Sequence, residues 1–123
     1  MARKPAKHLL SGQKAEDRAM RFLSRQGLRL VERNYRSPQG EIDLIMCEGP
    51  ALVFIEVRYR GNEKYGMAVE TVDLHKQRKL RACAEHYLIH NVRWNDRPCR
   101  FDVVTVVGDP VKGKIHWYTD AFQ

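Results

Sequence analysis

The sequence predicts a single α/β domain in which a central mixed β-sheet is flanked by helices. Apolar residues recur at helical spacing within residues 11–26 and again within residues 73–91. Between these segments, apolar runs at 40–47 and 51–58 flank a Gly-Pro turn signal, which is typical of two antiparallel strands. The length of 123 residues, with 43% hydrophobic residues, suits one domain around a single core.

The first helix is expected to begin at Ser11, a good N-cap, and to end near Gln26, because Gly27 follows. Residues 1–10 are basic and are expected to form a mobile arm, either solvated or touching phosphate. An apolar stripe of this helix should face the core: Ala15, Ala19, Phe22 and Leu23, with Met20 beside it.

Shorter signals predict the remaining elements. Asp73 is expected to cap the second helix, which should end near Asn91. Residues 61–70 are polar and contain two glycines, so a loop is expected there. The strands expected outside the hairpin cover residues 28–36, 99–107 and 114–119.

The hairpin would bring two carboxylates face to face. If its loop holds an even number of residues, Glu48 pairs with Ala51. The same register places Asp43 opposite Glu56, and directly opposed residues have Cβ atoms about 4.5–5.5 Å apart. Like charges repel at that distance, and partial burial makes the ionised forms more costly. A divalent cation would remove both costs, and Mg²⁺ or Mn²⁺ suits such oxygen ligands.

A plainer alternative is that both acids lie on a solvated face and pair with nearby Lys and Arg. Arg58 shares a face with Glu56 because strand side chains alternate with a period of two. In the same register Arg58 stands opposite Glu41, so a cross-strand ion pair would explain it equally well. Two acids and a cation on one face are also what a metal-dependent phosphodiesterase needs.

Several motifs resemble a family of uncharacterised bacterial proteins of the YraN type, which are related to restriction endonucleases and archaeal Holliday junction resolvases. The resemblance covers nearly the whole chain and rests on the order and spacing of its motifs. It implies a restriction-endonuclease-like version of the predicted fold. The motifs are Gly12 and Glu16, Arg33-Asn34-Tyr35-Arg36, the hairpin segments 40–45 and 53–58, Tyr65-Gly66, residues 76–80 and 100–104, and Ala121-Phe122.

The resemblance implies that Asp43 and Glu56 bind the metal and that Arg58 occupies a position usually held by lysine. Arginine stays protonated, so Arg58 would hold phosphate but make a poor general base. Activation of the attacking water would then depend on the metal. The family position of Glu16 suggests a third metal-binding acid, and Gln77 matches a glutamine that could orient water or a carboxylate.

Three other features have structural as well as functional interpretations. Glu16 lies along an apolar helix stripe and could simply reach solvent. Asp102 shares a strand face with two valines and is interpreted as structural or supporting, with Arg100 as a candidate partner. His86 and His90 have a spacing that can chelate zinc, but no third ligand is evident, so a helix end is the better interpretation.

Charge favours a nucleic-acid partner without requiring one. The chain has 22 Lys and Arg against 15 Asp and Glu, a net charge of +7. This balance is typical of phosphate-binding proteins, although many soluble proteins are basic without a specific purpose. For the cations near the second helix, a solvated face is the alternative. The residues expected to contact DNA are Arg36, Arg60, Lys76, Arg78 and Lys79.

These observations lead to one expected function and two alternatives. The leading hypothesis is an endonuclease that uses Mg²⁺ or Mn²⁺ and acts on structured or branched DNA. The alternatives are a non-catalytic DNA-binding module with a degenerate nuclease site, and a structural protein whose acids form ion pairs. A homodimer is a further hypothesis, since symmetric cutting of a junction needs two active sites.

Composition also predicts the compartment. Three widely spaced cysteines without a Cys-X-X-Cys pair favour a reducing environment. No apolar stretch approaches the length of a membrane span, and the basic N-terminus lacks the apolar core of a secretion signal. A cytoplasmic protein without a membrane partner is therefore expected.

Overall fold

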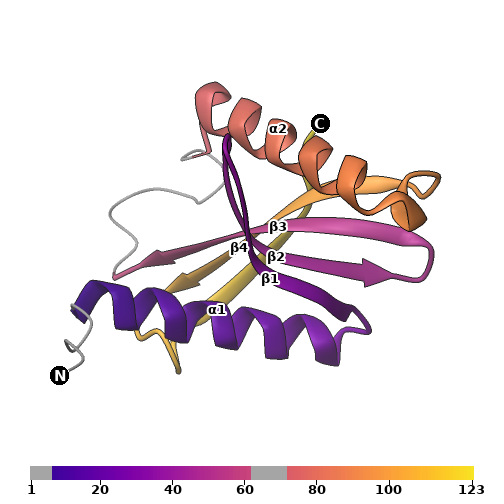
Figure 1. Ribbon diagram of the computed structural model, residues 1–123. Coiled ribbons are helices and arrows are strands. Elements are labelled where there is room, and N and C mark those ends of the chain that lie inside the picture. Colours follow the sequence, from indigo (N-terminus) through magenta and orange to yellow (C-terminus); the bar gives the residue numbers. More distant parts are fainter. Residues whose placement is uncertain (1–6, 62–71) are drawn as a thin grey trace, which may run out of the picture.

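The computed structural model describes residues 7–61 and 72–123 and shows one five-stranded sheet between two helices (Figure 1). The sheet order is β1-β2-β3-β4-β5. This architecture confirms the predicted α/β fold and is consistent with a restriction-endonuclease-like fold. The elements are α1 (Lys7–Arg25), β1 (Arg29–Ser37), β2 (Gly40–Glu48), β3 (Ala51–Arg60), α2 (Leu74–His90), the 3₁₀ turn η3 (Val92–Trp94), β4 (Cys99–Val107) and β5 (Lys114–Phe122).

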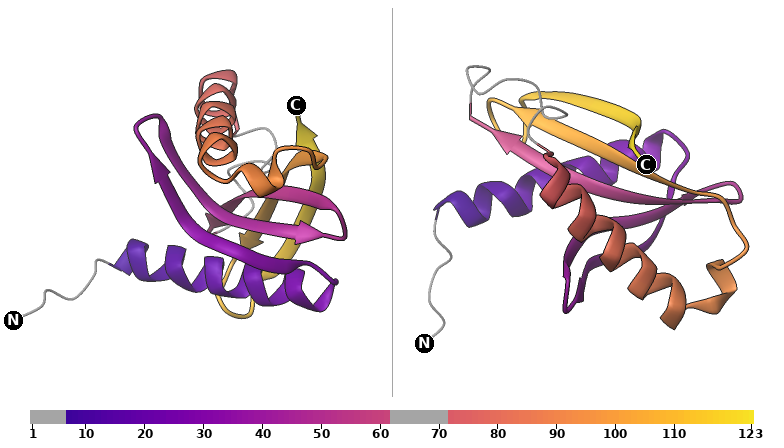
Figure 2. Two further views of the ribbon diagram at one scale, coloured as in Figure 1. Left: turned by 45° about the vertical axis from the view of Figure 1, so that its right-hand side comes forward. Right: turned by 90° about the horizontal axis from the view of Figure 1, so that it is seen from above.

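The sheet is mixed, as predicted. β3 and β4 pair in parallel, while the other neighbouring strands pair antiparallel. Parallel neighbours need a long crossover connection, and the chain between β3 and β4 contains α2. The turned views show α1 and α2 on opposite faces of the sheet (Figure 2).

Each helix covers its own hydrophobic core. Phe54 belongs to the core beneath α2, and the next residue, Ile55, belongs to the core beneath α1. This alternation follows from the period of two along a strand. Because both faces are covered, β3 carries a continuous run of buried residues from Leu52 to Glu56.

The first helix begins earlier than predicted. It starts at Lys7, so Ser11 lies within α1 and is not its N-cap. Serine tolerates helix interiors, and the preceding Lys and Leu residues are strong helix formers, so the capping signal was misleading. Of the predicted basic arm, residues 1–6 lie outside the described residues and residues 7–10 open the helix.

The end of α1 follows the prediction. Gly27 has a φ of 101°, and the Leu28 amide donates to the Leu23 carbonyl at 3.1 Å, which closes the helix. The predicted apolar stripe is largely confirmed, since Ala15, Ala19 and Leu23 are buried. Phe22 and Met20 are half-buried against the same core.

The second helix has the predicted cap. The Asp73 carboxylate accepts a hydrogen bond from the Lys76 amide at 2.8 Å, and the helix ends at His90, beside the expected Asn91. β5 continues three residues beyond the predicted Thr119, through an irregularity where Asp120 has a φ of 50°. Apart from Gly61, the predicted loop at 61–70 lies outside the described residues. Within the described parts, neither helix combines the length and apolarity of a membrane span.

Candidate active site

The predicted hairpin register is confirmed. Glu48 pairs with Ala51, and the pairs continue inward to Leu44 with Ile55. Asp43 and Glu56 are the next residues on each strand, where the described pairing ends. The Asp43 Oδ2 atom accepts a hydrogen bond from the Val57 amide at 2.8 Å, so its side chain replaces a backbone acceptor. The two carboxylates therefore lie at the fork where β2 and β3 separate.

A break in the pleat of β2 occurs at Asp43. Ile42 packs in the core beneath α2, whereas Leu44 packs beneath α1, although residues two apart in a strand normally share a face. The described pairs between β1 and β2 also skip this position, where the register would place Asn34. Beyond the break, the β1–β2 hairpin rises out of the sheet toward α2 (Figures 1 and 2), and the Gly40 carbonyl accepts from the Cys83 thiol.

Glu56 lies on the α2 side of the fork and is only 7% exposed. Its Oε1 atom lies 3.6 Å from Lys76 Nζ and 3.8 Å from Arg58 Nε. Both separations exceed the roughly 2.7–2.9 Å of a charge-assisted hydrogen bond, so the pairing is loose. Arg58 thus shares the site with Glu56, as predicted. Glu41 was the alternative partner expected for Arg58, and its described ion pair is with Arg36.

The environment of the fork favours the protonated acids. Burial, followed by the charge of Asp43, raises the pKa of Glu56 to about 7, against the lowering effect of Lys76 and Arg58. Burial also raises the pKa of Asp43, although the hydrogen bond from the Val57 amide opposes this shift. Two coupled carboxyl groups with raised pKa values are characteristic of catalytic and metal-binding sites.

Glu16 reaches the same neighbourhood from α1. Burial, followed by the charge of Asp43, raises the pKa of Glu16 to about 7, while Arg33 lowers it. Its side chain is 19% exposed, so it is not simply solvated. A hollow of about 850 Å³ is lined by both Glu16 and Asp43, together with Arg33, Asn34, Arg36 and Glu41. Glu16 and Asp43 therefore share this hollow, whereas Glu56 is not among its lining residues, so the set of three metal-binding acids that the resemblance implied is not assembled among the described residues.

Asn34 and Arg33 also line this hollow, and neither received a role from the sequence. With its amide nitrogen turned toward the acids, Asn34 donates to Glu16 Oε1 at 3.0 Å and to Glu41 Oε1 at 3.1 Å. Arg33 forms ion pairs with Glu16 at 3.7 Å and with Asp17 at 2.8 Å. Their place in the Arg33-Asn34-Tyr35-Arg36 motif, directly before the hairpin, was the signal that could have identified them.

The other predicted residues are distributed around α2 and the strand ends. The side-chain amide of Gln77 donates to the Val72 carbonyl at 2.9 Å. The described hydrogen bond of this side chain is therefore with the backbone just before α2. Arg78 and Lys79 are exposed on the first turns of α2, while Arg60 is half-buried at the end of β3. Of the cations predicted to contact DNA, Lys76 pairs with Glu56 and Arg36 pairs with Glu41.

His86 and His90 of α2 do not form a metal site with other described residues. Their rings stack with centroids 4.2 Å apart, and His86 Nδ1 also contacts the Tyr35 hydroxyl. More generally, the described residues contain no group of three His, Cys, Asp or Glu arranged to hold a metal ion. Asp43 and Glu56 still suit Mg²⁺ or Mn²⁺, which usually take one or two protein carboxylates and fill their other positions with water and phosphate.

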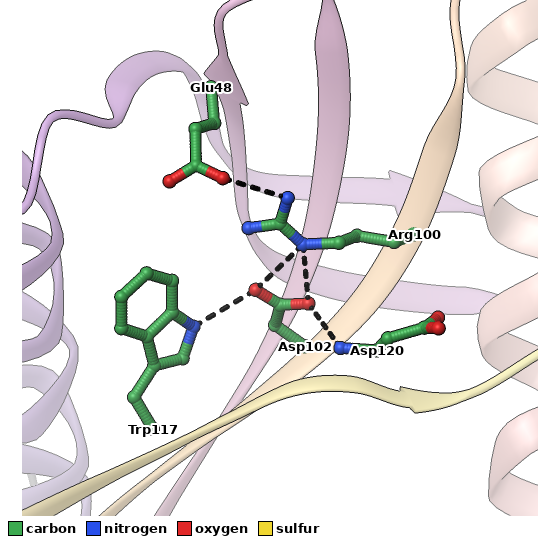
Figure 3. A network of polar contacts seen from close by, with 5 residues as sticks. All are labelled: Glu48, Arg100, Asp102, Trp117 and Asp120. Carbon is green, nitrogen blue, oxygen red and sulfur yellow. Dashed lines mark hydrogen bonds and ion pairs between the residues drawn. The ribbon is translucent and has the colours of Figure 1, made fainter.

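Asp102 is structural, as interpreted from the sequence, and lies in a separate network (Figure 3). It is fully buried and accepts hydrogen bonds from Arg100 Nε at 3.0 Å, Trp117 Nε1 at 2.9 Å and the Asp120 amide at 2.9 Å. Arg100 extends the network to Glu48 at 3.0 Å. The network joins β4 to β5 and to the end of β2.

The chain is similar to proteins from several bacteria. The model of "Uncharacterised protein family UPF0102" matches residues 15–106. A UPF0102 protein of Pseudomonas syringae pv. syringae (strain B728a) is 45% identical over 114 residues, covering 92% of this chain and 93% of the relative. One from Nitrosococcus oceani is 45% identical over 120 residues, covering 98% and 97%. One from Shewanella amazonensis is 49% identical over 112 residues, covering 90% and 97%. The YraN-type resemblance is thereby confirmed, and the chain belongs to the uncharacterised protein family UPF0102.

Proposed function

We propose that this protein is a divalent-metal-dependent endonuclease that acts on structured or branched DNA. The observation that carries the proposal is the fork between β2 and β3. There the half-buried Asp43 and the buried Glu56 lie at neighbouring strand positions, and burial raises the pKa of both. Two cations lie beside them, Lys76 and Arg58, but neither approaches Glu56 closely enough for a charge-assisted hydrogen bond.

The donor set at the fork suits Mg²⁺ or Mn²⁺. Asp43 and Glu56 offer carboxylate oxygens, and Glu16 would assist from the adjoining hollow. Since burial favours the protonated acids, cation binding would release protons and strengthen as the pH rises. When bound, the cation would act as a Lewis acid toward the phosphate and lower the pKa of bound water.

The two cations would bind the phosphate. Arg58 carries a planar guanidinium that can contact two phosphate oxygens, while Lys76 supplies a compact ammonium group from α2. The lysine that β3 lacks is therefore replaced near Glu56 by one from a different element. Both groups would stabilise the charge that develops on the phosphate oxygens during cleavage. Gln77, one residue after Lys76, stays a candidate for orienting water.

A separate basic surface supports a polyanionic partner. Four residues of α1, spaced at i, i+4, i+7 and i+11, share one outward face of the helix: Lys14, Arg18, Arg21 and Arg25. None of them forms an ion pair with another described residue, in contrast to Arg33, Arg36 and Arg58. Arg18 also donates to the Gly113 carbonyl, which anchors the β4–β5 loop beside this face. A DNA backbone would neutralise this surface.

A cleavage assay tests the proposal. Wild-type protein would be incubated with Mn²⁺ or Mg²⁺ and a panel of four-way junction, forked, linear duplex and single-stranded DNA. We expect cleavage of the branched substrates and its loss in Asp43→Ala. Asp96→Ala, which removes an exposed acid from the turn before β4, should retain activity. Cleavage that survives Asp43→Ala would contradict the assignment of the site.

A non-catalytic DNA-binding module is the second candidate. It is favoured by Arg58, which stands where a lysine is expected and is already paired with Glu56. Such a module would shift branched DNA in a gel, with a steep salt dependence and without cleavage. Under either proposal the protein would act in the cytoplasm. Symmetric cutting of a junction would in addition need a homodimer, which light scattering can detect.

A further inference from the structure

Asn34 has a backbone conformation that asparagine rarely adopts inside a strand. Its φ is 53°, and within the described residues the only other non-glycine residue with a positive φ is Asp120, at 50°. A left-handed backbone is strained for a non-glycine residue, although asparagine tolerates it better than most residues. Asn34 lies between the pairs Arg33–Leu44 and Tyr35–Ile42, where the register would place Asp43 opposite it.

The side chain of Asn34 joins two elements through the acids of the hollow. Its amide nitrogen faces Glu16 from α1 at 3.0 Å and Glu41 from β2 at 3.1 Å. A side-chain amide carries two N–H donors, so one donor is available to each carboxylate. Both acids interact unfavourably with another member of the site, because Glu16 is affected by the charges of Asp43 and Glu41. Asn34 therefore holds together groups that would otherwise repel one another.

Asp120 has a similar backbone conformation but makes its contact with a different group. Asp120 uses its backbone amide, which donates to Asp102, while its side chain is exposed. At Asn34, by contrast, the side chain makes the contacts and the backbone directs it into the hollow. Glycine would satisfy the backbone at either position. Only at position 34 would glycine also remove contacts to acids.

We propose that Asn34 is a positioning residue, which holds Glu16 and Glu41 beside Asp43 and thereby prepares the site for its divalent cation. This inference rests on the proposed function. Asn34 acts through the acids and touches neither the cation nor the phosphate. Residues that orient metal-binding side chains typically contribute about 10- to 100-fold to metal affinity.

Mn²⁺ binding by the full chain tests this role through two variants and a matched control. Asn34→Gly removes the amide and relieves the backbone, and Asp120→Gly relieves the backbone alone. Asn34→Asp keeps the size of the side chain but replaces the donor with a further carboxylate. Titration calorimetry would give the Mn²⁺ affinity, and thermal melting with and without Mn²⁺ would confirm folding and show the stabilisation by the ion.

The two substitutions at position 34 should change the response to Mn²⁺ in opposite directions. Asn34→Gly should bind Mn²⁺ about 10-fold or more weakly than wild type. Asn34→Asp should melt at a lower temperature without metal and show a larger Mn²⁺-induced rise, because the ion would relieve the added repulsion. Asp120→Gly should bind Mn²⁺ as wild type does. In cleavage assays, Asn34→Gly should need more Mn²⁺ for half-maximal rate while keeping most of its rate at saturation.

The outcomes distinguish this inference from the function on which it rests. Wild-type affinity in both Asn34 variants would overturn the positioning role while leaving the metal site intact. An equal loss of affinity in Asp120→Gly and Asn34→Gly would also overturn it, since backbone relief would then be the cause. Wild-type protein that binds no Mn²⁺ would overturn the proposed function and this inference with it.

Discussion

Asp102 and Glu56 are both buried carboxylates on neighbouring central strands, yet their surroundings differ. Asp102 receives three donors at 2.9–3.0 Å, from Arg100, Trp117 and the Asp120 amide (Figure 3). The cations beside Glu56 lie at 3.6 and 3.8 Å. A buried acid with close donors stabilises the fold, whereas one with loose partners bears a desolvation cost that a ligand can remove.

The origin of the donors explains this difference. The partners of Asp102 are a backbone amide, an indole ring, and an arginine two residues away on the same strand. Their positions are set once β4 and β5 have paired. Lys76 reaches Glu56 with a long side chain from α2, and Asp43 adds a second negative charge. We therefore expect a ligand to displace the cations beside Glu56, whereas the donors of Asp102 should stay in place.

The largest expected effect on stability concerns Asp102. Asp102→Ala should lower the free energy of unfolding by about 3–5 kcal/mol, because it leaves the partly buried Arg100 with only one of its two acids and removes the acceptor of Trp117 and Asp120. Urea denaturation measures the change. Asp96→Ala should stay within about 0.5 kcal/mol of wild type. A small loss in Asp102→Ala would show that this network contributes little to holding β4 and β5 together.

Glu56 should make the stability of the protein depend on pH. The pKa of Glu56 is raised from 4.5 to about 7, so in this interval the folded protein holds a proton that the unfolded chain has lost. Without divalent metal, the contribution of Glu56 to stability should therefore be fully present below about pH 4.5 and be lost as the pH rises to about 7. Three charged groups face Glu56: Asp43 raises its pKa, and Lys76 and Arg58 lower it.

Glu56→Gln removes this contribution. Urea unfolding with a chelator should show the variant about 1–2 kcal/mol more stable than wild type at pH 8 and equal to it at pH 4. Glu16, whose pKa is also raised to about 7, should leave part of the slope in place. If Glu56→Gln destabilised the protein at pH 8, Glu56 would belong with Asp102 as a satisfied structural acid.

Arg58 tests the chemistry of the fork. If the arginine limits cleavage, Arg58→Lys should raise the rate about tenfold, equivalent to about 1.4 kcal/mol of barrier. Lys76→Met should lower the rate, because it removes the other cation beside Glu56. Single-turnover cleavage of junction DNA measures both. A lower rate in Arg58→Lys would mean that the guanidinium itself is required.

The smallest effect is expected at the basic face of α1. The double variant Arg21→Gln/Arg25→Gln should reduce the slope of log K against log salt by nearly 2 in DNA-binding assays. Arg93→Gln/Arg97→Gln removes the same charge beside Trp94 and serves as the control. Equal changes in the two variants would indicate a general charge effect and no specific contact along α1.

The residue pattern was sufficient to predict the fold and the register of the hairpin that carries Asp43 and Glu56. The Gly49-Pro50 turn and the strand period placed Asp43 opposite Glu56, and the pairing of Glu48 with Ala51 confirms this register. Asp73 was also identified as a cap, because capping depends on residues within one helical turn. The start of α1 was predicted wrongly, since a serine within a helix resembles one at its end.

The sequence by itself determined the elements, the register of the hairpin and the candidate acids, because these depend on periodicity and turns over a few residues. Only the tertiary structure decided which charges meet. Lys76 reaches Glu56, and Asn34 bridges Glu16 to Glu41, across separations of 20, 18 and 7 residues. Such contacts arise when helices dock on a twisted sheet. No local pattern encodes them, since they depend on how the two faces are packed.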